Sequence, residues 1–263
     1  MEIPPIGLGT WQVRNCAEIV AHALKLGYRH IDTARKYGTE RAVGEGMRAC
    51  IVPRAEIFIT TKVSHERLRP AEVARSVSES LADLGVDYVD LLLVHWPSPE
   101  GVPLAETMQA MAAAKRAGLA RHIGVANFNI ALLEEAVRVS PEPLAALQAE
   151  YHPYLDQSKL LAACRRLGLA FVAHCPLGRG RLPLDPAIGE IARRQGRTAA
   201  QVALRWLLQQ GVAAIPRSSN PQRVAENLDV FGFELAPEEM RRIAALRRPD
   251  GRVANPAMAP AWD

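Results

Sequence analysis

Hydrophobic positions along the chain recur in two alternating patterns. Short apolar runs of about four to eight residues, of which residues 88–95 are the most continuous, are typical of parallel strands covered on both faces. Between these runs, apolar residues recur at helical spacing, as in residues 71–84, where Val73, Val77 and Leu81 share one face. The chain is therefore expected to alternate strands with helices.

Eight strand-and-helix units can be read from this pattern. The expected strands cover residues 6–10, 29–32, 57–62, 88–95, 121–125, 147–151, 170–174 and 212–215. The expected helices cover residues 17–26, 40–49, 71–84, 105–117, 130–139, 157–167, 187–195, 199–210, 221–228 and 237–246. Gly118 is placed to end the fourth helix and Asn129 to cap the start of the fifth.

Eight parallel strands joined by right-handed helical crossovers predict a (β/α)8 TIM barrel, an α/β fold common at a length of 263 residues. The rival is an open doubly wound sheet, which would favour a Gly-x-Gly-x-x-Gly turn after a strand. The chain contains no such turn. No low-complexity linker divides the sequence, so residues 1–263 are expected to form one barrel domain.

Composition narrows the possible functions. With 49% hydrophobic and 23% charged residues, the chain has the composition of a soluble globular protein. Its net charge of +4 is dispersed over predicted helices without interleaved aromatic residues, which argues against binding nucleic acid. No signal peptide and no apolar run of membrane-spanning length is visible, so no membrane association is expected. The four widely spaced cysteines predict reduced thiols in a cytoplasmic protein, with no metal site.

Four chemically complementary residues follow successive predicted strands: Asp32, Tyr37, Lys62 and His95. In a barrel, the loops after the strands meet at one end, so these side chains are expected to lie together. They are the groups needed to protonate a carbonyl oxygen: Tyr37 as the acid, and His95 as a hydrogen-bond donor to the same oxygen. An ordinary phenol has a pKa near 10, and a nearby Lys62 ammonium, oriented by Asp32, is expected to lower it.

Each of these residues also has a simpler interpretation. A lone Asp at a strand end usually caps a turn, a lone Lys is usually solvated, and a His ending a buried strand is typically a core residue. A strand-end Lys also anchors pyridoxal phosphate in other barrels. Asp32, Tyr37 and His95 are suited to proton transfer instead, and the combination favours carbonyl reduction.

Five motifs, in this order, resemble those of the aldo-keto reductase family. They are IGLGTW (residues 6–11), YRHIDTA (28–34), LVHWP (93–97), IGVANF (123–128) and IPRS (215–218). The short loop 96–99 and the ending 261–263 most resemble the bacterial 2,5-diketo-D-gluconate reductase B group. This resemblance implies an NADPH-dependent carbonyl reductase on a (β/α)8 barrel without a Rossmann motif. It assigns the catalytic roles to the same four residues.

The resemblance also implies contacts with NADPH at two clusters. Asn127 and Gln148 are expected to bind the nicotinamide carboxamide. At the start of a helix, backbone amides and arginine side chains are expected to bind the 2'-phosphate, although a capped helix with solvated arginines is the simpler alternative. The full set of expected coenzyme-binding residues is Thr10, Trp11, Asp32, Asn127, Gln148, His174, Pro176, Leu177, Arg217, Ser218, Ser219, Arg223, Glu226 and Asn227.

Two residues depart from the family pattern. Ala126 stands where the family usually has Ser, which removes one hydroxyl contact with the nicotinamide. His174 stands where the family has a larger aromatic residue that stacks on the nicotinamide ring. An imidazole stacks with less area and is expected to titrate near neutral pH.

The substrate mouth is expected to include Trp11, Tyr37, His95 and Trp96, with Trp262 as a further candidate. Short loops here favour small polar carbonyl compounds such as 2,5-diketo-D-gluconate, methylglyoxal or simple aldehydes. The expected partner is thus a small-molecule carbonyl substrate, and the chain is expected to act as a monomer. The alternative function is a non-catalytic NADPH-binding sensor or partner subunit on the same barrel.

Overall fold

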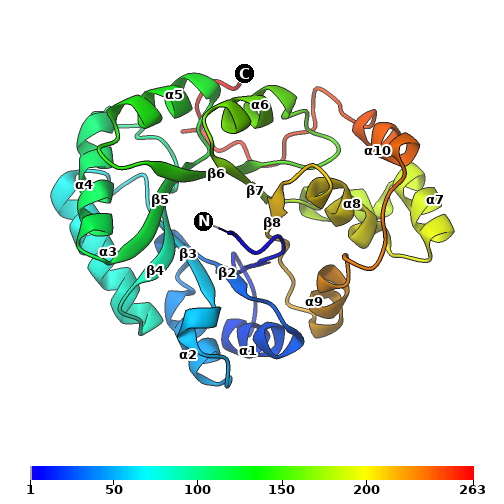
Figure 1. Ribbon diagram of the computed structural model, residues 1–263, viewed down its shortest axis with the longest axis horizontal. Helices are drawn as coiled ribbons and strands as arrows, with labels where there is room; N and C mark the ends of the chain where they lie inside the picture. Colours follow the sequence, from blue (N-terminus) through cyan, green and yellow to red (C-terminus); the bar gives the residue numbers. More distant parts are fainter. Residues whose placement is uncertain (1) are drawn as a thin grey trace.

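The computed structural model describes residues 2–263, and eight parallel strands form its centre (Figure 1). The strands are β1 (Leu8–Gly9), β2 (His30–Asp32), β3 (Phe58–Val63), β4 (Val89–Val94), β5 (Ala120–Ala126), β6 (Leu144–Glu150), β7 (Ala170–His174) and β8 (Ala213–Ala214). Neighbours in sequence are neighbours in the sheet. The first and last strands meet where Ile6 bridges Ala214 and the Gly7 amide donates to the Ala214 carbonyl (2.9 Å). The predicted (β/α)8 barrel is confirmed.

Helices surround the strands (Figure 1). They are α1 (Cys16–Leu26), α2 (Glu40–Arg48), α3 (Pro70–Leu84), α4 (Leu104–Arg116), α5 (Ile130–Val139), α6 (Ser158–Arg166), α7 (Pro186–Gln195), α8 (Ala199–Leu208), α9 (Pro221–Leu228) and α10 (Pro237–Ala244). Short 3-10 helices are η1 (Arg35–Tyr37), η2 (Arg54–Glu56), η3 (Gly178–Gly180) and η4 (Leu182–Leu184). Both α7 and α8 follow β7, and α10 packs against α7.

Element boundaries differ from the expected ones mainly at the ends. β6 begins at Leu144 rather than at residue 147, because strand pairing incorporates alanines that have little intrinsic preference for strands. β1 and β8 are shorter than expected, and Ile6 contributes only an isolated bridge. The two predicted helix ends are confirmed: Gly118 adopts φ 76° after α4, and Asn129 accepts a hydrogen bond from the Leu132 amide (2.9 Å).

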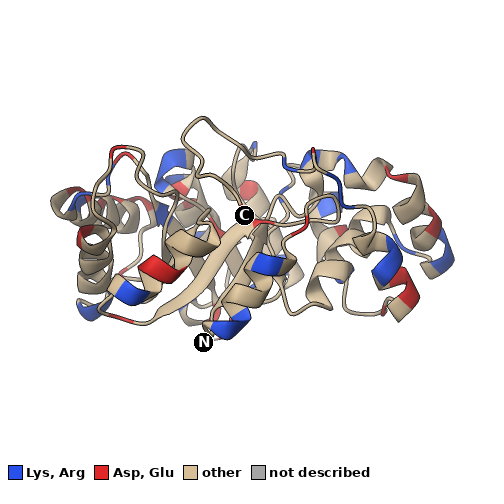
Figure 2. Cartoon of the chain, turned by 90° about the horizontal axis from the view of Figure 1, so that it is seen from above, with Lys and Arg blue, Asp and Glu red and all other residues tan. Residues whose placement is uncertain are grey.

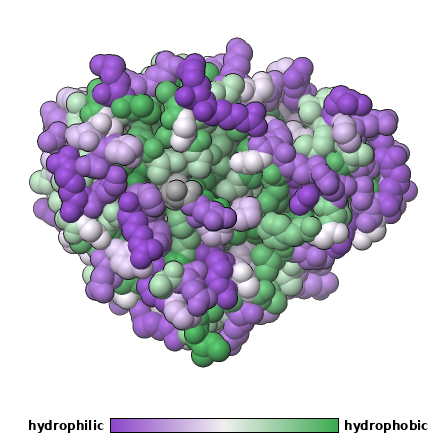
Figure 3. Space-filling model, viewed as in Figure 1, coloured by the Kyte–Doolittle hydropathy of each residue, from purple (hydrophilic) through white to green (hydrophobic). Residues whose placement is uncertain are grey.

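Side-chain alternation along β4 separates two layers of packing. Leu91 and Leu93 point into the barrel, where they join Ala126 and Ala146. Leu92 and Val94 point to the opposite side of the strand and pack outward against the helices. The amino-terminal segment places Ile3 against the inner clusters. The segment that leads into β1 lies over the middle of the barrel (Figure 1), where the surface is apolar with hydrophilic side chains around it (Figure 3).

Charged residues of both signs are mixed over the outer helices (Figure 2). Many charged residues of the helices and the loops beside them pair, as Lys115 does with Glu142 (2.9 Å) and Arg247 with Asp156 (3.1 Å). Within residues 2–263, no helix has both the length and the apolar character required to cross a bilayer.

Gly124 and Gly189 provide a matched test of this packing. A Cβ at Gly124, where the β5–β6 register shifts, would overlap the Ala146 carbonyl oxygen and lie 2.9 Å from Leu93 Cδ2. Gly124→Ala should therefore destabilise the fold by about 1–3 kcal/mol, the usual cost of overpacking. A Cβ at Gly189 in α7 meets nothing within 4 Å, so Gly189→Ala should stabilise the fold by about 0.5–1 kcal/mol. Urea unfolding measures both, and equal midpoints for the two variants would contradict this description of the β5–β6 contact.

Candidate active site

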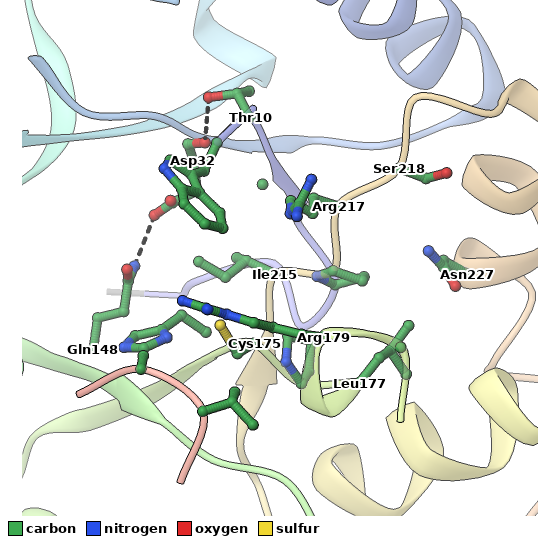
Figure 4. Close-up of a pocket in the computed structure, with 18 of the residues that line it drawn as sticks. Thr10, Asp32, Gln148, Cys175, Leu177, Arg179, Ile215, Arg217, Ser218 and Asn227 are labelled. Atoms are coloured by element: carbon green, nitrogen blue, oxygen red, sulfur yellow. Dashed lines mark hydrogen bonds between the residues drawn. The ribbon is translucent and has the colours of Figure 1, made fainter. Parts of the chain in front are cut away.

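A large cavity opens where the strands end, with a volume of about 1090 Å³. Of the expected site residues, those on its wall are Thr10, Trp11, Asp32, Tyr37, His95, Trp96, Asn127, Gln148, His174, Pro176, Leu177, Arg217, Ser218, Ser219, Arg223, Glu226 and Asn227. Two candidates are not on the wall: Trp262, described below, and Lys62, which lies behind Asp32 with 1% of its surface exposed. The cavity joins two clusters that the sequence separates: Gln148 lies on one side, and Ser218 and Asn227 lie on the other (Figure 4).

The Asp32 carboxylate lies at the centre of the first cluster. Its Oδ1 accepts a hydrogen bond from Lys62 Nζ (2.5 Å), and its Oδ2 accepts one from Gln148 Nε2 (2.7 Å; Figure 4). Lys62 Nζ also donates to the Thr33 carbonyl oxygen (2.8 Å). β2, β3 and β6 each place one of these side chains inside the barrel, and the carboxylate holds the amine and the amide in fixed positions.

Tyr37 reaches the same region from η1. The turn is anchored by Arg35, which pairs with Glu40 (3.1 Å), Glu79 (3.2 Å) and Asp83. Tyr37 Oη lies 3.5 Å from His95 Nε2, at the outer limit of a hydrogen bond, and the two rings meet edge to face at 76°. Such contacts commonly shorten when substrate binds.

The electrostatics differ from the expectation. Lys62 Nζ lies 5.1 Å from the Tyr37 ring centroid, yet burial raises the pKa of Tyr37 well above 10, and the charges of Asp32 and Cys175 act in the same direction. The expected lowering by Lys62 is wrong, because desolvation of the phenolate outweighs the attraction of an amine already paired with Asp32. Burial also lowers the pKa of Lys62, against the opposing effect of Asp32.

His95 and His174 are neutral imidazoles. Burial lowers the pKa of His95 well below its ordinary value, and Lys62 adds to the effect. Burial lowers the pKa of His174 to about 4, so its expected titration near neutral pH is wrong. A neutral imidazole keeps one N–H donor, which His95 can direct to a substrate oxygen.

Asn127 connects these two histidines. Its backbone is left-handed (φ 61°), its Nδ2 donates to the His95 carbonyl oxygen (2.8 Å), and its Oδ1 accepts from His174 Nε2 (2.7 Å). Each polar group of the Asn127 amide therefore has one protein partner and can make a second hydrogen bond, whereas Gln148 uses only Nε2. Of the two residues expected to bind the nicotinamide carboxamide, Gln148 is the one whose acceptor, Oε1, has no protein partner among residues 2–263.

At the start of α9, two of the backbone amides expected to attract an anion already have a protein partner. Asn220 caps the helix with its own side chain, and its Oδ1 accepts from the Gln222 (2.9 Å) and Arg223 (3.2 Å) amides. These donors are therefore already used. Two of the expected hydroxyl groups also have local partners, because Ser218 Oγ accepts from the Asn220 amide (3.0 Å) and Ser219 Oγ accepts from the Arg14 amide (2.8 Å).

The cationic side chains nearby remain available. Over residues 2–263, neither Arg217 nor Arg223 forms an ion pair, and both lie on the cavity wall. The Arg217 guanidinium lies 4.9 Å from the Trp11 ring centroid. Attraction of an anion to this cluster therefore depends on two guanidinium groups and the orientation of α9.

Sequence reasoning missed Arg179. Its guanidinium lies 5.3 Å from the Trp11 ring centroid, and the side chain extends across the pocket (Figure 4). Arg179 has a left-handed backbone (φ 53°) between Gly178 and Gly180. The only signal in the sequence was an arginine between two glycines in the loop after the seventh strand.

The chain's last residues were also missed as part of the wall. The residues Val253, Ala254, Asn255, Pro256 and Met258 line the cavity, and none of them was among the expected site residues. Trp262 does not line the cavity. Its ring packs edge-on against Trp96 at a centroid distance of 6.2 Å.

Comparisons with known proteins agree with this geometry. The model of the aldo/keto reductase family matches residues 5–248. The methylglyoxal reductase DkgB of Escherichia coli O157:H7 is 41% identical over 267 residues and is covered completely, as is this chain. The mouse aldo-keto reductase family 1 member A1 is 36% identical, over 94% of this chain and 87% of its own length.

Solved structures give the same result. A crystal structure described as a candidate 2,5-diketo-D-gluconic acid reductase B is 47% identical, with a TM-score of 0.96 over 99% of this chain and 94% of that one. A Bombyx mori aldo-keto reductase in complex with NADP is 36% identical, with a TM-score of 0.88 over 93% of this chain and 89% of that one. These findings confirm the resemblance to the 2,5-diketo-D-gluconate reductase B group. The chain belongs to the aldo/keto reductase family.

Proposed function

We propose that the protein uses NADPH to reduce small polar aldehydes and ketones to alcohols, with Tyr37 as the proton donor. The observation that carries this proposal is the position of Tyr37 and His95 in a cavity that extends to the Arg217 and Arg223 guanidinium groups. The relatives named methylglyoxal reductase and 2,5-diketo-D-gluconic acid reductase B indicate the class of substrate.

The cavity has the residues that a dinucleotide phosphate needs. Gln148 Oε1 is a free acceptor for a carboxamide, and Arg217 and Arg223 are unpaired cations at the other side. Trp11 and Leu177 supply apolar wall between them. NADPH bound there would supply a hydride to the carbonyl carbon.

The chain's own residues then complete the reduction. Negative charge develops on the carbonyl oxygen, and the Tyr37 hydroxyl gives its proton to that oxygen. Because its pKa is raised, Tyr37 keeps this proton throughout neutral pH until a stronger base forms beside it. The His95 N–H can orient the same oxygen, and Lys62 lies close enough to stabilise the resulting phenolate.

A second function is favoured by one observation. Each polar group of the Asn127 amide already bonds a protein atom, which leaves one hydrogen bond at each for the nicotinamide. A non-catalytic NADPH-binding sensor would tolerate weaker contacts at the nicotinamide. Purified protein mixed with NADPH and methylglyoxal separates the two functions, because only a reductase lowers the absorbance at about 340 nm, where reduced nicotinamide absorbs.

The state of the cysteines bears on the compartment in which the protein acts. All four cysteines are free thiols. We therefore propose that the protein acts in the cytoplasm. We further propose that it acts there as one monomeric barrel domain.

Tyr37→Phe tests the proton donor. Removing the hydroxyl should lower kcat by about 10²- to 10⁴-fold, the usual range for general acid catalysis, while the Kd for NADPH stays within about twofold. Steady-state kinetics and fluorescence titration measure the two quantities. A variant that keeps more than about a tenth of kcat would exclude Tyr37 as the acid.

Arg223→Ala tests coenzyme choice. Loss of charge-assisted hydrogen bonds worth about 1.5–3 kcal/mol should weaken NADPH binding roughly ten- to a hundredfold and leave NADH binding nearly unchanged. Arg138→Ala is a matched control, because Arg138 is an exposed arginine on α5 that does not line the cavity. An equal loss for NADPH and NADH would show that Arg223 does not bind the 2'-phosphate.

The low pKa of His174 predicts the absence of a pH effect. With a folded-state pKa of about 4, the imidazole stays neutral between pH 7.5 and 5.5. The ratio of the NADP⁺ and NADPH affinities should therefore be constant over this range, and fluorescence titrations at several pH values measure it. A fall in NADP⁺ affinity that disappears in His174→Tyr would mean that His174 does titrate there.

A further inference from the structure

Glu150 is a buried carboxylate to which the reaction described above gives no role. It lies on β6 two residues after Gln148, and its exposed fraction is 1%. Its Oε1 accepts hydrogen bonds from His152 Nε2 (2.9 Å) and the Val253 amide (2.6 Å), and its Oε2 accepts one from the Ala254 amide (2.7 Å). Two of the three donors therefore belong to the backbone of the chain's last segment.

That segment is the wall of the cavity. Residues 253–256 and 258 line it, and residues 251–263 contain no helix or strand that would hold them by backbone pairing. The far end of the segment is held separately, where the Ile130 amide donates to the Asp263 carboxylate (3.0 Å) and Asn129 Nδ2 donates to the Ala261 carbonyl oxygen (2.8 Å). The wall thus extends between an attachment on β6 and an attachment at α5.

The segment also reaches the aromatic part of the mouth. The Arg252 guanidinium lies 3.7 Å from the Trp262 ring centroid, and Trp262 packs against Trp96, which lines the cavity. Arg252, which precedes the two attached residues, therefore contacts the ring that packs against Trp96. Charge-assisted hydrogen bonds are about twice as strong as neutral ones, so Glu150 is the strongest attachment of the near end.

We propose that Glu150 is a positioning residue that holds residues 253–258 as the substrate-side wall of the cavity. It does not touch the reacting atoms: β6 presents Gln148 to Asp32 and, two residues later, Glu150 to the wall. The effect on catalysis rests on the proposed carbonyl reduction. Releasing the wall should weaken binding of the carbonyl compound and leave coenzyme binding and proton transfer unchanged.

Glu150→Gln tests this proposal, because the amide keeps one acceptor and presents an NH₂ group where the second acceptor was. We expect the KM for methylglyoxal to rise about tenfold, with kcat and the Kd for NADPH within about twofold. Ala254→Pro removes one of the bonded backbone N–H groups from the other side and should raise KM similarly. Because both changes break the same contact, the KM of the double variant should not exceed the higher of the two single-variant KM values.

Asp90→Asn is the matched control. Asp90 is also a buried carboxylate that accepts a backbone hydrogen bond, from the Ile59 amide (2.9 Å), together with one from Arg54 (2.8 Å). It lies near the start of β4, at the opposite end of the barrel from the site. Asp90→Asn should lower thermal stability without changing KM, whereas a purely structural role for Glu150 would give the two variants the same kinetics.

Three results would overturn the proposal: an unchanged KM in Glu150→Gln, equal falls in kcat and NADPH affinity, or additive effects in the double variant. If the wild-type chain reduces no carbonyl compound, the proposed function fails, and amide hydrogen exchange still tests the attachment. Exchange at Val253 and Ala254 should then be about tenfold faster in Glu150→Gln than in wild type or Asp90→Asn. Wild-type protection of these amides in the variant would overturn the attachment itself. Should Glu150→Gln fail to fold, Ala254→Pro and exchange at Val253 give the same test.

Discussion

The Asp32 carboxylate is the contact on which the site depends. It binds a buried amine from β3 and an amide from β6, so it joins strands from two parts of the barrel wall. A buried ammonium without a partner is strongly disfavoured, and breaking such a pair typically costs about 3–5 kcal/mol. The same carboxylate therefore stabilises the barrel interior and fixes the positions of Lys62 and Gln148 relative to the phenol. Stability and site geometry have a common origin at this residue.

Burial has a larger effect than neighbouring charges on the pKa values of Tyr37, His95 and His174 in the mouth of the barrel. Lys62 lies near Tyr37, but its own charge is compensated by Asp32, and desolvation keeps the phenol protonated. Desolvation also keeps His95 and His174 neutral. In their resting state these side chains are neutral donors and acceptors, which suits a reaction whose charge appears only as the carbonyl bond is reduced.

The local pattern was sufficient to predict the fold, and together with the family resemblance it predicted about half of the residues that line the cavity. The hydrophobic pattern locates the end of each strand. Because a barrel brings the carboxyl ends of all its strands to one rim, Asp32 and His95 could be placed at that rim. Partners far apart in sequence could not be predicted this way. His174 and Asn127 are 47 residues apart, and Glu150 and Val253 are 103 apart. The helix cap by Asn220 was a local signal, and its consequence for the neighbouring amides was overlooked.

The left-handed residues around the mouth have a consequence for engineering. Among residues 2–263, five non-glycine residues have positive φ, namely Gln12, Asn15, Asn127, Cys175 and Arg179, and all lie in loops that follow β1, β5 or β7. Asparagine tolerates this conformation, but in the other three it stores strain of about 1–3 kcal/mol each. A laboratory selection for heat resistance would therefore find easy gains by introducing glycine at these positions. These positions lie in the loops that shape the cavity. Selection for thermostability without an activity screen would therefore alter the geometry of the cavity mouth before other parts of the protein.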